Sequence, residues 1–173
     1  MTDTETLVNT ILSEITDLSG TIVVPMLPHD LVVCVDDTNK QVYPKCGTML
    51  RATIEEATTT GTFGTDIPWI GEPKVSGLEL VPSPNVTNGW TQIGTSWWKL
   101  VNVLCAIDKR LHSPGQMVIV VSEFAARELA RMLFDHRKFA NIEFAYPDTG
   151  TVSVVRDPKG QIVGVRRLIR VEC

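Results

Sequence analysis

Residues 96–133 read SWWKLVNVLCAIDKRLHSPGQMVIVVSEFAARELARML, and their pattern predicts the fold class. Ser96 can cap a helix that runs to about Leu111 with a broad apolar face. The apolar run 117–121 then predicts a buried strand, and Ser122 can cap a second helix. A helix–strand–helix order of this kind is typical of mixed α and β domains. The second helix is expected to turn five residues inward, namely Phe124, Ala125, Leu129, Met132 and Leu133.

The N-terminal segment has the pattern of an amphipathic helix. Thr2 and Glu5 have the spacing of a capping box, and Gly20 provides a stop. Such a helix can close over its own domain or dock on a neighbouring subunit, so Leu7 and Ile11 are candidate partner contacts. The apolar stripe consists of Leu7, Val8, Ile11, Leu12, Ile15 and Leu18.

Short β-branched runs in the N-terminal and C-terminal parts of the chain predict strands. Residues 21–57 have the pattern of an antiparallel meander, because their apolar runs are separated by turn residues. Further strands are expected at 142–146 and in a hairpin formed by 151–156 and 161–171. The predicted class is therefore α+β in a single domain over 1–173, with an N-terminal helix, antiparallel strands, a long arm and a final helix–strand–helix–strand–hairpin.

All four tryptophans lie within thirty residues, at Trp69, Trp90, Trp97 and Trp98. The segment 58–96 holds six of the twelve glycines and four of the ten prolines, but only four charged residues. Low charge and large aromatic side chains disfavour a solvated linker, so we expect an extended, ordered arm or loop. Trp97 and Trp98 belong to the start of the following helix. Trp69 and Trp90 are left as the arm residues expected to contact a partner.

The overall composition is that of a globular protein, with 43% apolar and 21% charged residues and a net charge of −4. No apolar run is long enough to cross a membrane, and no signal peptide is visible at the N-terminus. We therefore expect a soluble protein located in the cytoplasm or in a virion. Its four widely spaced cysteines are expected to be free thiols.

Charge is distributed unevenly along the chain. Residues 1–107 carry five basic and twelve acidic side chains, whereas residues 108–173 carry eleven basic and eight acidic ones. Opposite charges of this kind suit head-to-tail contact between copies, with Arg166 and Arg167 as candidate contact residues. The alternative is that both halves share one fold and their charges face water. Nucleic acid binding is disfavoured, because acidic residues are interleaved with the C-terminal arginines.

No residue pattern points to a catalytic centre. Ser122 lacks the flanking glycines of a nucleophile elbow, and His29, His112 and His136 have no second ligand at zinc spacing. Carboxylate pairs at 36–37 and 55–56 could hold a divalent cation if their strands were neighbours. We assign no catalytic residue, metal ligand or cofactor.

The strand and capped helix over 117–133 resemble the central domain of tailed-phage capsid proteins of the HK97 type. The resemblance implies a structural subunit of a virion, in a head or tail. Together with the arm, the terminal helix and the charge distribution, it favours a non-enzymatic subunit of a homo-oligomer or hetero-assembly. Two alternatives stay open: an enzyme with dispersed catalytic residues, such as a metal-dependent hydrolase, and a carbohydrate-binding module with tryptophan platforms.

Overall fold

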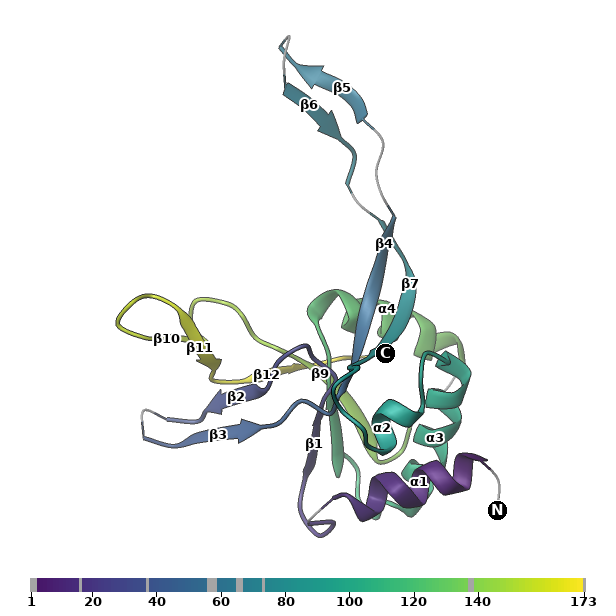
Figure 1. Cartoon of the computed structure of the whole chain (residues 1–173). Helices are drawn as coiled ribbons and strands as arrows, with labels where there is room; N and C mark the ends of the chain where they lie inside the picture. Colours follow the sequence, from purple (N-terminus) through teal and green to yellow (C-terminus); the bar gives the residue numbers. More distant parts are fainter. Residues whose placement is uncertain are drawn as a thin grey trace.

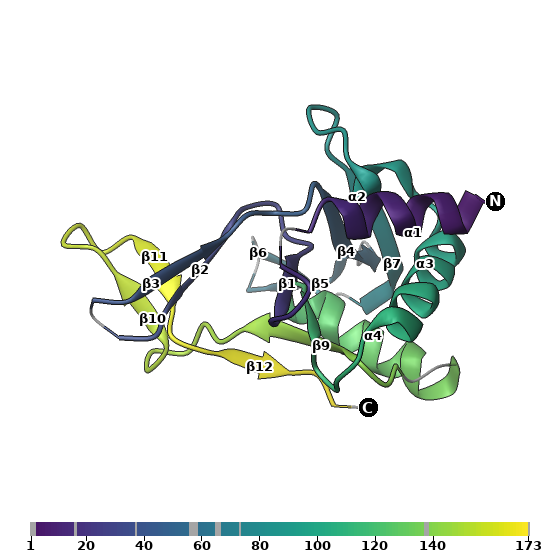
Figure 2. The ribbon, with the colours of Figure 1, turned by 90° about the horizontal axis from the view of Figure 1, so that it is seen from below.

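The structure is a computed structural model, and it describes residues 3–15, 17–36, 38–55, 59–64, 67–72, 74–136 and 139–172. Within these ranges the chain forms a body of helices and one sheet, from which two β projections extend (Figure 1). Seen from below, one projection extends to the left of the body, while helices α1 and α3 lie to its right (Figure 2). The predicted α+β class is confirmed.

The body is built on a four-stranded sheet with the order β1-β8-β9-β12. Strands β1 (Ile22–Pro25), β8 (Met117–Val120) and β9 (Ile142–Pro147) are parallel, and β12 (Leu168–Arg170) is antiparallel to β9. The apolar runs of β1 and β8 fit the buried positions of a parallel sheet. The meander expected over 21–57 is correct only for its middle pair, Leu31–Cys34 with Lys40–Tyr43. The first strand, β1, pairs with β8, and the last, Thr48–Glu55, pairs with Lys74–Pro82.

Helices α1 (Asp3–Ser13), α2 (Gly89–Gln92), α3 (Trp97–Arg110) and α4 (Glu123–His136) contribute to the main hydrophobic core. Two of the predicted caps are confirmed. Ser96 Oγ accepts a hydrogen bond from the Lys99 N–H at 3.2 Å, and Ser122 Oγ accepts one from the Ala125 N–H at 3.3 Å. The capping box predicted at Thr2 lies outside the described residues.

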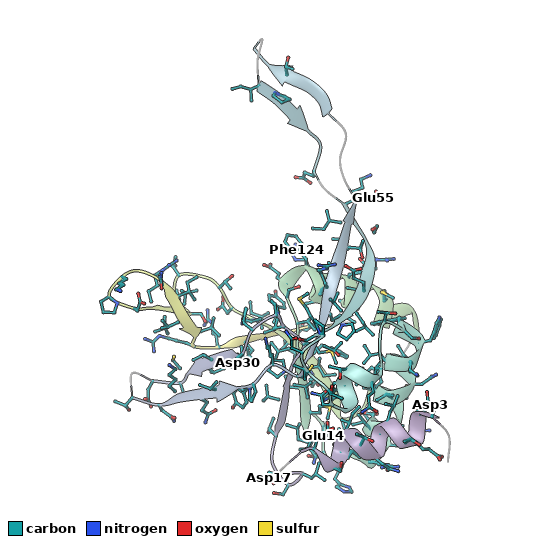
Figure 3. The ribbon with its side chains drawn as sticks, viewed as in Figure 1. Asp3, Glu14, Asp17, Asp30, Glu55 and Phe124 are labelled. Atoms are coloured by element: carbon teal, nitrogen blue, oxygen red, sulfur yellow. The ribbon has the colours of Figure 1, made fainter. Side chains whose placement is uncertain are left out.

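Phe124 was expected to face inward, but it is 59% exposed. The buried side of α4 begins one residue later, at Ala125, and continues to Leu129. Consecutive helical residues differ by about 100° in direction, so Phe124 points away from the core. Figure 3 shows it near the foot of the upper projection.

The first projection, here called the wing, is a four-stranded sheet with the order β10-β11-β2-β3. It consists of β2 (Leu31–Cys34), β3 (Lys40–Tyr43), β10 (Val154–Arg156) and β11 (Ile162–Val165). The predicted C-terminal hairpin corresponds to β10 and β11, which are antiparallel. The chain then leaves the wing, and β12 joins the central sheet instead of extending the hairpin.

The second projection, here called the arm, spans residues 48–82. Strands β4 (Thr48–Glu55) and β7 (Lys74–Pro82) form its lower ladder, and β5 (Thr59–Phe63) pairs with β6 (Ile67–Ile70) at its tip (Figure 1). The arm therefore begins and ends earlier in the sequence than the predicted arm at 58–96. Residues 83–96 are not part of it, because they return to the body and include α2.

Candidate assembly surfaces

The arm is anchored by buried side chains at its base. Leu50 and Leu80 are register partners on β4 and β7, and they are 1% and 3% exposed in the main core. The Thr48 hydroxyl, also buried, donates a hydrogen bond to the Trp90 carbonyl oxygen at 3.1 Å. These contacts fix the direction in which the arm leaves the body.

Burial along the arm decreases with distance from this base. Ile54 lies on the same strand as Leu50, beyond a register irregularity between Thr53 and Ile54, and it is 52% exposed. Ile67, on β6, is 62% exposed. Figure 1 shows the β5–β6 tip far from the body. A two-stranded hairpin of this kind is marginally stable in water by itself, so a covering surface would stabilise it.

The two predicted arm tryptophans lie in different environments. Trp69 is in β6 by its backbone, and the orientation of its side chain lies outside the described structure. Its predicted partner contact therefore stays a prediction. Trp90 is not on the arm: it lies in α2, is 6% exposed and packs in the chain's own core.

The structure also revises the predicted partner contacts at Leu7 and Ile11. These α1 residues are 4% and 0% exposed, and both belong to the main core. The apolar side of α1 is covered by the body because α1 packs beside α2 and α3 (Figure 2). Leu18, predicted in the same stripe, lies beyond the end of α1 and is 46% exposed. Gly89 permits this close approach, since a Cβ atom there would lie 2.6 Å from Ile11 Cγ1. Like Trp90, these two side chains leave almost no surface for another molecule.

The wing carries the predicted contacts Arg166 and Arg167, both exposed. Arg167 Nε donates a hydrogen bond to Asp148 Oδ2 at 2.5 Å. The Arg167 guanidinium, with the Gly150 N–H, holds the pKa of the Asp148 carboxyl below its usual range. The Arg166 N–H donates to Ser153 Oγ at 3.1 Å. These bonds hold the segment that connects the wing to the central sheet.

A hollow of about 510 Å³ lies beside the wing, and sequence reasoning missed it. Its apolar lining includes Leu31, Val32, Ile162 and Val163, and the last two are 56% and 39% exposed. Strands β2 and β11 approach closely because β11 contains Gly164, where a Cβ atom would lie 3.0 Å from the Val32 carbonyl oxygen. That glycine within an apolar strand was the available sequence signal.

Of the candidate cation ligands, the two that the structure describes, Asp36 and Glu55, are not brought together. Asp36 follows β2 in the wing, where its carboxylate accepts hydrogen bonds from the Thr38 and Asn39 N–H groups at 2.9 and 2.6 Å. Glu55 ends β4 on the arm (Figure 3), in a different sheet from β2. Asp37 and Glu56 lie outside the described residues. Among the residues that the structure describes, no three His, Cys, Asp or Glu side chains are grouped as metal ligands.

Four arginines in the C-terminal part of the chain, where nucleic acid binding is disfavoured, have acidic partners. Ion pairs join Arg127 to Glu123, Arg131 to Glu128, Arg167 to Asp148 and Arg170 to Glu143. Pairing of this kind compensates the charge of these four guanidinium groups, which lowers their attraction for phosphates.

The tryptophan platform proposed for sugars is not assembled in the described part of the chain. Trp90 is buried, and Trp97 is partly buried against the main core. Asn88 caps α2, with its Oδ1 accepting a hydrogen bond from the Thr91 N–H at 2.9 Å, and its amide donates to the Cys46 carbonyl oxygen. Trp90 and Asn88, two of the side chains considered for a sugar platform, therefore have structural roles.

Comparison with protein-family models, curated proteins and solved structures finds no match to this chain. None of the helices in the described ranges is long and apolar enough to span a membrane. The function must therefore be argued from the surfaces themselves.

Proposed function

We propose that this chain is a non-enzymatic structural subunit that associates with copies of itself through the arm. The observation that carries the proposal is the contrast between the buried base of the arm, at Leu50 and Leu80, and its exposed distal part, at Ile54 and Ile67. A projection of this length costs conformational entropy to order. Contact with another molecule would offset that cost.

The chemistry of the described groups supports a structural role. Asp17, Asp36 and Asp148 have lowered pKa values, and in each the main cause is hydrogen bonding that holds a local turn or an arginine. Burial raises the pKa of the Cys46 thiol to about 11, so this thiol is protonated at neutral pH and is a poor nucleophile. Each of these shifts has a local structural cause, and the four described groups do not converge on a cleft.

The resemblance of 117–133 to tailed-phage capsid proteins suggests the setting for such a subunit, a virion head or tail. In that setting many identical copies contact one another through repeated surfaces. Electron microscopy of the concentrated protein tests this part of the proposal, because regular shells, rings or tubes would support it.

Shortening the arm tests the self-association directly. Glu55 and Lys74 are register partners, so replacing 56–73 with Asn-Gly should close β4 and β7 with a two-residue hairpin turn. The base of the arm, including Leu50 and Leu80, stays in place. Light scattering should show wild-type masses above the 19.1 kDa of one chain and a monomeric shortened variant. A wild-type chain that is monomeric at every concentration would refute the proposal.

A further inference from the structure

We propose that the arm of one copy docks on the wing of a second copy. In this contact the acidic distal arm faces the basic β10–β11 hairpin, and exposed apolar side chains of the arm enter the hollow beside β11. The inference rests on the proposed self-association, and it identifies the two surfaces that meet.

Charge complementarity selects the wing as the surface that receives the arm. Residues 55–72 of the arm contain four acidic side chains and no lysine or arginine. Residues 150–167 of the wing contain one acidic side chain, Asp157, and four basic ones. The Asp157 carboxylate accepts the Lys159 and Gln161 N–H groups at 2.9 Å each, so it is engaged within its own turn. The basic side chains are Arg156, Lys159, Arg166 and Arg167, and all four are exposed. Arg167 is paired with Asp148, so the inference rests mainly on Arg156 and Lys159 of the hairpin.

The apolar parts of the two surfaces also match. Ile162 and Val163 are exposed beside the hollow, and Ile54 and Ile67 are exposed on the arm. Exposed β-branched side chains on opposing strands pack well against each other when water is removed. His29 and Asp30 also line the hollow, and Arg156 is the register partner of Ile162 beside it, so its apolar centre has a polar rim, as in a typical interface.

Direction and charge decide between the possible arrangements of two copies. The arm and the wing leave the body in different directions (Figures 1 and 2), so the arm does not cover the wing of its own chain. Two distal arms facing each other would bring acidic segments together, and like charges disfavour that pairing. The arm-to-wing contact is heterologous, so each docked copy still offers one arm or one wing. Copies joined in this way form a ring or extend further.

A charge exchange tests the contact. The arm variant carries Glu55→Lys and Glu72→Lys, and the wing variant carries Arg156→Glu and Lys159→Glu. All four side chains are exposed, so we expect the fold to persist, as circular dichroism can verify. Sedimentation velocity should show association weakened about tenfold or more in each variant. The chain with all four substitutions should recover to within about threefold of wild type, because the opposite charges again face each other.

Matched controls separate this inference from the proposed function. Lys109→Glu with Arg127→Glu makes the same change in net charge as the wing variant, but on α3 and α4, and it should leave association near the wild-type value. A wing variant that associates like wild type, or a four-substitution chain that does not recover, would overturn the arm-to-wing contact. Self-association that still depends on the arm would then stand. A monomeric wild-type chain would overturn both.

A second readout uses no substitution. Raising NaCl from about 0.05 to about 0.5 M shortens the screening length severalfold, so wild-type association should weaken if opposite charges meet at the rim. Association that is unchanged across this range would contradict the charge argument.

Discussion

The base of the arm should contribute to the stability of the monomer, whereas the distal arm should not. Leu50 and Ile54 allow a matched test, because they lie four residues apart on one strand. Leu50 is 1% exposed, and Ile54 is 52% exposed. Leu50→Ala removes three buried carbons, worth about 2.4 kcal/mol at about 0.8 kcal/mol each, and leaves a cavity that brings the loss to about 3 kcal/mol. Ile54→Ala should cost about 0.5 kcal/mol or less.

The assay is unfolding by urea or heat at a concentration where the chain is monomeric, because association adds apparent stability. For a chain of this size, a loss of about 3 kcal/mol corresponds to a fall in Tm of about 6–12 °C. Ile54→Ala should instead weaken association at higher concentration. Equal destabilisation by the two substitutions would refute the reasoning, because it would mean that the distal arm packs on its own body.

Three further predictions follow from the described contacts. Trp90→Ala should lower the free energy of unfolding by about 3–5 kcal/mol, measured by denaturant unfolding, because the indole is buried in the core; unchanged stability with lost association would contradict this placement. Asp148→Asn should lower the free energy of unfolding above pH of about 4. The difference in unfolding free energy between variant and wild type should shrink as the pH falls through the lowered pKa of Asp148, because the wild-type carboxylate is then protonated. A difference that grows in acid would contradict this prediction. Cys46 should resist iodoacetamide at pH 8 until the chain is unfolded in urea, as followed by peptide mass spectrometry, because a pKa of about 11 leaves about 0.1% thiolate; rapid labelling of the native protein would show that the thiol is accessible.

The body could be predicted from the sequence because its patterns report burial. Ser96 and Ser122 marked the starts of two helices, and the apolar runs in β1 and β8 marked buried strands. The pairing of β1 with β8 could not be predicted, because the two strands are more than ninety residues apart and a short apolar run does not reveal its partner.

The strands of the arm could not be predicted from such patterns. Strands such as β5 and β6 lie away from the body, so they need no alternation of apolar and polar residues, and the segment had no visible period. Tryptophan alone did not distinguish a core position from an exposed one. Trp90 is buried in the short helix α2, where Asn88 and Thr91 form a capping box that the sequence analysis did not identify.

The predicted partner contacts were also only partly accessible to sequence analysis. Leu7 and Ile11 gave a correct helix stripe, but a stripe does not show whether its own domain or a partner covers it. The wing hollow depends on the junction of β2 with β11, which are far apart in sequence, so no local pattern could place it.

The proposed self-association requires that the distal arm contacts another copy of this chain. Hydrogen exchange of the amides in β5 and β6, measured at concentrations below and above the onset of association, tests it most directly. We predict rapid exchange in the dilute monomer and clear protection in the concentrated sample, while amides in β8 are protected throughout. Equally rapid exchange of the β5 and β6 amides at every concentration would contradict the claim.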